Sequence, residues 1–388
     1  MNTKSDFIQQ LRSSYPGLQT KPLEDIVSEN LISPFAVELP SSVLKQAQEV
    51  VATLFALREK PAYRAHYQDL IQEKGLQDPG NKSIMMSYDF HLDENQNLKL
   101  IEVNTNAAFL ILGYEMYQMK GHALPIKDFS LSEMGADIRE ELHLQGKTAS
   151  EKLKVAIIDE TPSEQRLYVE FLVYNELYKS FGWDSRIMDY REVFQDFDPE
   201  FIYNRYTDFF LTAPASQKLR EKFLKREVCL SPNPYEYLLL ADKQRMIDWM
   251  QAGFLESLGV EAAAAALIRQ TVPFSYDLKP EAAEQVWAER KKLFFKPKNA
   301  FGSKQSYKGA SISNKAFQEI VGQDMIAQEF VPAPEQTFET PEGPQKFKFD
   351  LRCYAYKGRL QLVLARLYQG QVTNLRTPYG GFATVLFQ

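Results

Sequence analysis

The sequence contains little cysteine and histidine. Among 388 residues there are two cysteines, Cys229 and Cys353, and four histidines. No CxxC pair or Cys/His cluster links them, which argues against a disulfide scaffold and a structural zinc site. No serine or cysteine nucleophile lies at a recognisable spacing from any histidine, so we interpret all four as surface or internally satisfied residues: His66, His91, His122 and His143.

Long apolar runs are also missing, and so is a surplus of positive charge. No stretch reaches the roughly 18 apolar residues of a membrane span, and MNTKSDFIQQLRSSYPG has no apolar core of signal-peptide length. With 51 acidic against 45 basic residues the net charge is −6, so no global positive field favours nucleic acid. We expect a cytoplasmic protein with small-molecule partners, without nucleic-acid or membrane partners; the sequence leaves a homodimer open.

The pattern along the chain predicts an α/β (α+β) protein with several domains. Hydrophobic residues make up 44% and charged residues 25%, as in ordinary globular proteins. Apolar positions at intervals of three and four predict a helical N-terminal region, residues 1–80. Alternating stretches then predict a strand–turn–strand unit within 81–150, a small α/β domain over 151–235, and mixed strands and helices over 236–312 and 313–388. Within the last part, PAPEQTFETPEGPQ reads as a flexible connection and Lys357-Gly358 as a hairpin turn.

The stretch KLIEVNTNAAF carries the first chemical signal. Residues two apart on a strand share a face, so Glu102 and Asn104 project together while Val103 points into the core. Two oxygen donors on one face suit Mg²⁺, which takes one or two protein oxygens and completes its shell with waters and phosphates. The alternative is a polar rim where a strand leaves its sheet.

A second signal is the segment LFFKPKNAFGSKQSYKG. Lys296 ends an apolar strand and is followed by a loop with small residues and lysines, including Gly302, Ser303 and Lys304. Backbone N–H groups of small residues approach phosphate oxygens closely, and lysines neutralise them. The loop is not a Walker A motif, and a solvated hairpin tip is the competing interpretation.

Further polar groups follow in the last sixty residues. A strand leaving through Gln328, Glu329, Phe330 and Val331 offers main-chain donors and acceptors that an adenine ring can pair with. Asp350 and Arg352 again share one strand face and combine a metal-type oxygen with a phosphate-type guanidinium. Arg366, Asn374 and Arg376 continue the polar series toward the C-terminus.

These stretches, taken in order, resemble circularly permuted ATP-grasp proteins, the group with eukaryotic-type glutathione synthetase and glutathionylspermidine synthase. The resemblance covers roughly residues 82–384 and rests on MSYDFHLDENQNLKLIEVNTNAAF, ADKQRM with Lys243, FIYNRYTD with Arg205, and LARLYQGQVTNLRTPYGG. It implies that 81–150 supplies the permuted E-x-N hairpin, 151–235 the substrate-binding domain, 236–312 the lid subdomain and 313–388 the core subdomain of an ATP-grasp fold.

The resemblance also implies an activity, an ATP- and Mg²⁺-dependent carboxylate–amine ligase that works through an acyl phosphate. Glu102, Asn104 and Asp350 would hold the metal, and Lys243, Lys296 and Arg366 would contact the phosphates. Residues 299–309 would close over the site, and residues 328–331 would hold adenine. Arg205 and Arg376 are the candidates for contacts to a substrate carboxylate or to the acyl phosphate.

The sequence departs from these relatives at two positions. The position of a metal-binding glutamate in the eukaryotic-type enzyme corresponds to Ala300 here. The position of an arginine that contacts substrate in the glutathione-type relatives lies near Met86 or Ser87, and this chain has no arginine there. Glutathione precursors are therefore not assumed as substrates. Two alternatives stay open, a kinase-like ATP-grasp protein that stops after phosphorylation and an ATP-binding regulatory protein without turnover.

Overall fold

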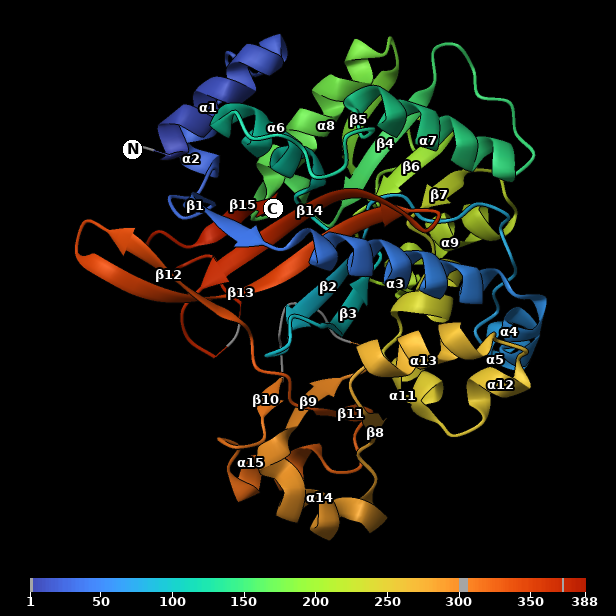
Figure 1. Ribbon diagram of the computed structural model, residues 1–388. Coiled ribbons are helices and arrows are strands. Elements are labelled where there is room, and N and C mark those ends of the chain that lie inside the picture. The colour runs from blue at the N-terminus through green and yellow to red at the C-terminus, as the bar shows by residue number, and fades with distance from the viewer. Residues whose placement is uncertain (1–2, 300–305, 372) are drawn as a thin grey trace.

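The computed structural model describes residues 3–299, 306–371 and 373–388. Over these residues the strands form three sheets, each with its own helices, so the predicted α/β class is confirmed. In Figure 1 a parallel sheet lies at the top, a large mixed sheet crosses the middle, and a small antiparallel sheet projects below. No helix in the described part of the chain has the length and apolar character needed to cross a membrane.

The large sheet has seven strands in the order β1-β15-β14-β13-β2-β3, with β12 paired to β13. Its strands are β1 (Ile32–Leu39), β2 (Met86–Leu92), β3 (Leu98–Asn104), β12 (Glu335–Thr340), β13 (Gly343–Tyr356), β14 (Arg359–Tyr368) and β15 (Gly381–Phe387). Both predicted hairpins are present, β2–β3 and β13–β14. The second turns at Lys357 and Gly358, whose φ angles of 50° and 75° are those that a tight two-residue turn requires.

The N-terminal region is not purely helical, contrary to the prediction for residues 1–80. Residues 32–39 form strand β1, which pairs in parallel with β15 at the other end of the sequence. The helices around it are α1 (Thr3–Ser14), α2 (Leu23–Ile26), α3 (Ser41–Glu59), α4 (Pro61–His66) and α5 (Gln68–Glu73). Buried Glu115 accepts hydrogen bonds from Gln10, Ser14 and Tyr15 and thereby ties α1 to α6 (Leu110–Lys120). The region is thus built into the large sheet.

The expected flexible connection at PAPEQTFETPEGPQ is also wrong in part. Residues 335–340 form β12, which pairs antiparallel with the first half of β13. Phe338 of β12 stacks on Phe35 of β1 with ring centroids 4.6 Å apart, so the two outer strands of this sheet approach each other. The two rings bury apolar surface against each other. The acidic and proline-rich residues around Phe338 gave no indication of this packing in the sequence.

The second sheet is parallel, in the order β5-β4-β6-β7. Its strands are β4 (Lys154–Asp159), β5 (Asp184–Asp189), β6 (Phe201–Asn204) and β7 (Cys229–Ser231), and its neighbouring helices are α7 (Leu131–Leu144), α8 (Tyr168–Ser180) and α9 (Gln217–Leu224). The apolar faces of α8 and the strands share one buried cluster, which includes Val155, Ile157 and Tyr174.

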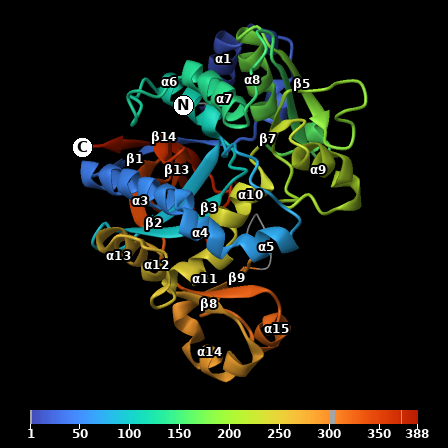
Figure 2. The same ribbon diagram turned by 90° about the vertical axis from the view of Figure 1, so that its right-hand side faces the viewer.

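The third sheet is antiparallel, in the order β10-β9-β11-β8. It contains β8 (Ser275–Asp277), β9 (Leu293–Pro297), β10 (Tyr307–Lys308) and β11 (Met325–Glu329) with α14 (Ala283–Glu289) and α15 (Asn314–Ile320). It stands apart from the other layers in Figures 1 and 2, with its own core around Phe295 and Phe317. Since β11 pairs with β9, this unit continues beyond residue 312, where the sequence suggested a boundary.

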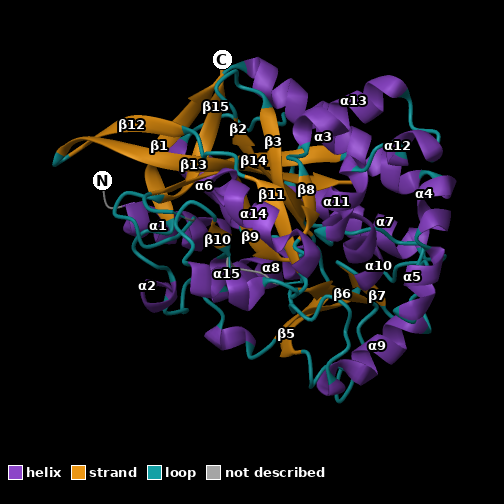
Figure 3. Cartoon of the chain, turned by 90° about the horizontal axis from the view of Figure 1, so that it is seen from below, coloured by secondary structure: helices purple, strands orange, loops and turns teal. Residues whose placement is uncertain are grey.

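Short helices connect this unit to the large sheet: α10 (Pro234–Glu236), α11 (Gln244–Met250), α12 (Phe254–Ser257) and α13 (Ala262–Thr271). A π-helical turn, Tyr237–Ala241, lies between α10 and α11. Seen from below in Figure 3, α12 and α13 lie beside α3 and α4 along one side of the molecule. The small sheet is therefore attached through a helical layer that packs on the large sheet.

Candidate active site

A cavity of about 470 Å³ lies where the small antiparallel sheet meets the large sheet. Side chains from β3, β13 and β14 line one wall, and residues of β9 and β11 line the other. Twelve residues singled out from the sequence as candidate polar or binding groups line this cavity: Glu102, Asn104, Lys243, Lys296, Gln328, Glu329, Phe330, Val331, Asp350, Arg352, Arg366 and Asn374. The fold therefore brings together segments that are far apart in the sequence, from the β3 strand with Glu102 to the β14 strand with Arg366.

Two predicted substrate contacts are not among the lining residues, Arg205 and Arg376. Arg205 donates a 2.7 Å hydrogen bond to buried Glu170, which in turn accepts from the Phe109 N–H. Arg376 is exposed on the loop after β14. Gly302, Ser303, Lys304 and Ala300 lie outside the described residues, so the predicted phosphate loop and its closure over the site stay predictions.

Sequence reasoning missed Asp89 of β2, which joins two residues of the cavity lining, Arg352 and Arg366, in one charged cluster. The Asp89 carboxylate accepts hydrogen bonds from Nε and Nη2 of Arg352 at 2.9 and 2.6 Å and from Nη2 of Arg366 at 2.8 Å. Ser87 Oγ and Asn104 Nδ2 donate to it as well, at 3.1 and 3.2 Å. Burial would raise the pKa of Asp89, but the two guanidinium charges hold it below its ordinary value.

Strand register explains this cluster. Asp89 is paired with Glu102 on one side and with Arg352 on the other, and Ser87 is paired with Asn104. Directly paired residues on neighbouring strands point to the same face of a sheet. The β2 strand therefore lies between the predicted metal strand β3 and the D-x-R strand β13, and Asp89 is the link between them.

Glu102 has the environment expected of a metal ligand. Its carboxylate accepts a 3.2 Å hydrogen bond from the Asn104 amide and makes no ion pair with a described residue. A carboxylate that makes no ion pair with a described residue can serve as a ligand of a divalent ion. The two side chains point the same way, as their i, i+2 spacing predicts.

Asp350, the third predicted ligand, is already engaged. Both of its oxygens accept from Arg366, at 2.7 and 2.9 Å, and Thr373 Oγ1 donates to one of them at 2.7 Å. Asp350 and Arg366 are directly paired across the β13–β14 ladder. In this arrangement Asp350 orients the guanidinium of Arg366 toward the cavity.

Lys296 joins the two walls of the cavity. Its ammonium group donates a 2.8 Å hydrogen bond to the carbonyl oxygen of Ile101, next to Glu102. The side chain is 7% exposed, and this burial lowers its pKa to about 8, although the charge of Glu102 opposes the shift. Lys296 is therefore a buried cation that a phosphate would stabilise.

The lining as a whole favours an anionic ligand. Among the described lining residues, seven are lysine or arginine and three are carboxylates. Within the described chain, four of these cations make no ion pair with a carboxylate: Lys296, Lys308, Lys348 and Arg166. Lys308 instead lies over the Phe330 ring at 4.5 Å, and Lys348 donates to the carbonyl of Gly370 at 2.8 Å. This excess of positive charge is what a polyphosphate would neutralise.

The segment predicted to hold adenine has a partly engaged backbone. The N–H groups of Glu329 and Phe330 donate to the carbonyls of Phe274 and Lys292, each at 2.8 Å. The carbonyl of Val331 accepts from His91 Nδ1 at 2.9 Å. The Val331 N–H makes no hydrogen bond to a described residue, so it is the donor of this segment that a base could use.

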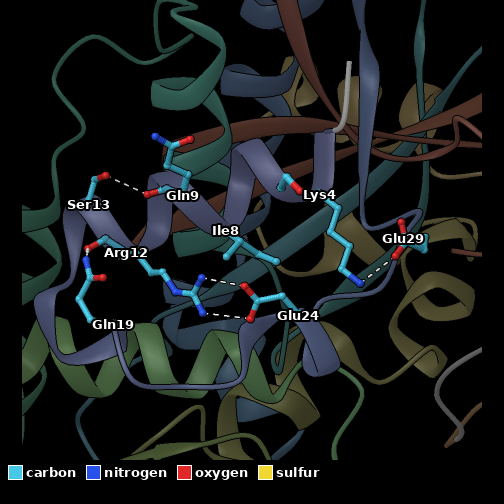
Figure 4. A pocket seen from close by; sticks show the side chains of 9 residues that line it. Lys4, Ile8, Gln9, Arg12, Ser13, Gln19, Glu24 and Glu29 are labelled. Atoms are coloured by element: carbon cyan, nitrogen blue, oxygen red, sulfur yellow. Dashed lines mark hydrogen bonds and ion pairs between the residues drawn. The ribbon is translucent and has the colours of Figure 1, made fainter.

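A second cavity, of about 530 Å³, lies against α1 at the N-terminus. Its charged side chains pair with each other, Lys4 with Glu29 at 2.8 Å and Arg12 with Glu24 through two hydrogen bonds (Figure 4). The buried side chain of Ile8 lies between these pairs. With its charges balanced internally, this cavity has no bias toward an anion or a cation.

Comparison with known proteins gives matches by structure. No protein-family model matches the sequence, and no curated protein matches it. The chain is similar to the apo form of a glutathione synthetase-like effector from Globodera pallida, with a TM-score of 0.57 and 11% identity over 92% of this chain and 90% of the other.

Two further solved structures are similar at lower scores. A protein described as a γ-glutamylcysteine synthetase from Methylobacillus flagellatus KT has a TM-score of 0.45 and 10% identity over 88% of each chain. The ATP-grasp ligase PsnB, solved with a minimal precursor, has a TM-score of 0.31 and 11% identity over 54% of this chain and 89% of its own.

The sheets and the cavity between two of them define an ATP-grasp fold, as the sequence predicted. Within that class, the similarity along nearly the whole chain shows the glutathione synthetase-like form of the fold. The sheet order joins the N-terminal hairpin β2–β3 directly to β13, an arrangement that a circular permutation would produce. The permutation itself stays a prediction.

Proposed function

We propose that the protein is an ATP- and Mg²⁺-dependent carboxylate–amine ligase. One observation carries the proposal: a single cavity collects Glu102 and Asn104 from β3, Lys296 from β9 and Arg366 from β14, with a surplus of lysine and arginine. The same cavity is lined by cations that suit a polyphosphate, by oxygens that suit a divalent ion, and by the end of strand β11, where a base could bind. The glutathione synthetase-like fold is consistent with this chemistry.

The nucleotide would lie along the small antiparallel sheet. The base would contact the segment from Gln328 to Val331, where the Val331 N–H is available as a donor. Lys296 and Lys243 would contact the phosphates, and Lys308 would move from the Phe330 ring onto them. These contacts are charge-assisted, which makes them stronger than neutral hydrogen bonds.

The side chains fit a magnesium ion at Glu102 and Asn104. Mg²⁺ commonly takes one or two protein oxygens and completes its shell with phosphate oxygens and water. When bound, the ion would supply positive charge that offsets the negative charge of the phosphates. Asp350 would act mainly through Arg366, since both of its oxygens are bonded to that guanidinium.

The reaction would run in two steps. A carboxylate oxygen of the acid attacks the γ-phosphorus of ATP, the bond from γ-phosphorus to the bridging oxygen breaks, and ADP leaves with the electron pair. The amine nitrogen then attacks the carbonyl carbon of the acyl phosphate, and inorganic phosphate leaves as the nitrogen loses a proton to solvent or a nearby base. Arg366 and Lys296 would stabilise the charge on the transferred phosphoryl group.

An ATP-binding protein without turnover is the second candidate. It is favoured by the engagement of Asp350 with Arg366 and Thr373, because a metal site with fewer free carboxylates supports phosphoryl transfer less well. Such a protein would bind Mg-ATP without releasing ADP in the presence of any acid and amine. A kinase-type enzyme, by contrast, would release ADP without needing an amine.

Isothermal titration of ATP with and without Mg²⁺ tests the site. We expect the wild-type protein to bind Mg-ATP more tightly than ATP alone. In Glu102→Gln the increase in affinity that Mg²⁺ causes should be at least about tenfold smaller, because the carboxylate ligand is replaced by an amide. Glu94→Gln is the matched control, an exposed glutamate in the turn of the same hairpin. Equal magnesium dependence in wild type and Glu102→Gln would disprove the assignment.

The reaction itself is tested by ADP release with mass detection of products. A panel of amino acids and short peptides, offered as single compounds and in pairs, separates the three functions. A ligase releases ADP with an amide product only when acid and amine are both present. Release with one compound and a stable phosphoester product would indicate the kinase.

A further inference from the structure

The end of the cavity away from the small antiparallel sheet is formed in part by the parallel-sheet unit. Arg166 and Leu167, in the segment between β4 and α8, line the cavity together with Leu375 from the loop after β14. In Figure 1 the parallel and small antiparallel sheets lie at opposite ends of the molecule, with the large sheet between them. Arg166 belongs to the parallel-sheet unit, whereas the proposed nucleotide contacts lie on β9 and β11 of the small antiparallel sheet.

The segment that carries Arg166 is held in place by hydrogen bonds. The N–H of Thr161 donates to Asp189 Oδ2 at 2.8 Å, and Gln165 Nε2 donates to the carbonyl of Glu160 at 2.5 Å. Arg166 Nη2 reaches the carbonyl of Leu375 at 3.4 Å, across the cavity edge. These bonds hold the segment before α8, and Arg166 itself is exposed at the cavity edge, so most of its guanidinium is left for another partner.

Arg166 makes no ion pair with a described carboxylate. In this it differs from Arg205, which is bonded to Glu170 and is not among the residues that line the cavity. The substrate-contacting arginine of the relatives has no counterpart here: Ser87, near its position, is buried and bonded to Asp89. Among the described residues of the parallel-sheet unit, Arg166 is the one cation that lines the cavity.

The middle of the cavity presents two further guanidinium groups. Arg352 and Arg366 use Nε and Nη2 to bind Asp89 and Asp350, and their Nη1 atoms make no hydrogen bond to a described residue. These two atoms are suited to the carboxylate that becomes phosphorylated. A ligand that reaches from them to Arg166 would meet positive charge at both ends.

We propose that Arg166 binds a second carboxylate of the acid substrate, so that the substrate is a diacid rather than a monoacid. The inference rests on the proposed ligase function and goes beyond it by naming the specificity residue. Of the three lining carboxylates, Asp350 is bonded to Arg366, Glu102 belongs to the proposed metal side, and Glu329 lies on β11 of the small antiparallel sheet. No described lining carboxylate therefore belongs to the parallel-sheet unit, where it could receive a cationic substrate group beside Arg166. Arg166 takes the role that the resemblance assigned to Arg205 and Arg376.

The test compares diacids with their monoamides, which keep the shape and lose one charge. Succinate, glutarate and adipate, each against its monoamide, are titrated into the protein with Mg²⁺ and the non-hydrolysable analogue adenylyl imidodiphosphate. We expect at least one diacid to bind about 10- to 100-fold more tightly than its monoamide, the range for one charged hydrogen-bonded contact. Arg166→Met should remove that difference and leave the affinity for the analogue unchanged.

Two variants control the experiment. Arg166→Lys keeps the charge without the planar fork and should retain part of the preference. Arg186→Met removes an exposed arginine on β5, outside the cavity lining, and should retain all of it.

Two results overturn the inference alone: no diacid preference in the wild type, or an unchanged preference in Arg166→Met. If the nucleotide analogue does not bind the wild-type protein, the proposed function fails first, and the inference fails with it. The nucleotide titration therefore distinguishes the two failures.

Discussion

Lys296 on β9 donates a hydrogen bond to the carbonyl oxygen of Ile101 on β3, at 2.8 Å. This contact connects the small antiparallel sheet to the large sheet beside the proposed magnesium ligand Glu102. A bound phosphate would compete with that carbonyl for the ammonium group, because an anion is the better acceptor for a buried cation. Under the proposed function, nucleotide binding would therefore be coupled to the contact between the two sheets through one side chain.

The pKa of Lys296 predicts a pH dependence of ATP binding. With a pKa of about 8 in the ligand-free protein, Lys296 is charged at pH 7 and loses its proton above pH 8. The phosphates favour the charged form, so binding above pH 8 must take up a proton and the affinity should fall by up to about tenfold per pH unit. Calorimetry in buffers of different ionisation enthalpy measures the uptake directly.

The matched variants for this prediction are Lys296→Arg and Lys298→Arg. Arginine stays charged throughout, so Lys296→Arg should bind ATP with a flat pH profile between pH 7.5 and 9.5. Lys298 is two residues away, bonded to Asp277 and Asp324 and outside the cavity lining, so its replacement should leave the wild-type profile. A wild-type affinity that does not change over this interval would contradict the assigned role.

Replacing Asp89 should destabilise the whole protein. Asp89→Asn removes the counter-charge of Arg352 and Arg366, and breaking a buried ion pair from one side costs about 3–5 kcal/mol. Ser87→Ala, which removes one hydrogen bond to the same carboxylate, should cost about 1 kcal/mol. Urea unfolding at pH 7 measures both.

The same residue predicts an acid-sensitive stability. The pKa of Asp89 is lowered in the folded state, so its contribution to the free energy of unfolding is complete above the ordinary value of 3.8 and is lost as the pH falls below it. The stability difference between wild type and Asp89→Asn should therefore shrink on acidification below pH 3.8. A constant difference down to pH 2 would show that the carboxylate charge is not what matters.

The β13–β14 turn allows a comparison of two glycines with nearly equal backbone strain. Gly358 has φ 75°, and a Cβ atom there would lie 3.0 Å from Cβ of Phe55, whereas Gly146 has φ 77° and open space around it. Alanine at Gly146 should cost about 1–2 kcal/mol for the left-handed conformation alone. Gly358→Ala should cost about 1 kcal/mol more because α3 must shift. Thermal unfolding of the two variants gives the difference; equal losses would mean that Phe55 adapts freely.

Local sequence signals were sufficient for the hairpins and for much of the cavity lining. The strands around Asp93 and around Lys357-Gly358 alternate clearly and end in turn residues, and the i, i+2 rule correctly put Glu102 and Asn104 on one face. Strand β1 was missed because its neighbour β15 lies about 350 residues away and a parallel partner leaves no turn to recognise. Strand β12 was missed because the prolines and acidic residues in and around it indicate a loop more strongly than its short alternating stretch indicates a strand.

The remainder of the site depends on tertiary pairing. Asp89 gave no signal, since its importance comes from lying between β3 and β13, which only the strand order reveals. The resemblance to known enzymes suggested Arg205 by its place in the chain, but position along a strand does not determine whether a side chain faces a cavity or a buried glutamate. Arg166 had no sequence signal at all, because it precedes a helix in a segment without a motif.

The parallel pairing of β1 with β15 has a consequence for how the chain can fold. Strand β1 has β15 as its one strand neighbour among the described residues, so it cannot join a sheet until residues 381–387 are in place beside β14. A fragment made of residues 1–80 would leave Val37 and Leu39 without the surface that buries them. We therefore expect this part of the polypeptide to gain protection from hydrogen exchange late and together with the C-terminal strand, as contacts distant in sequence form more slowly than local ones.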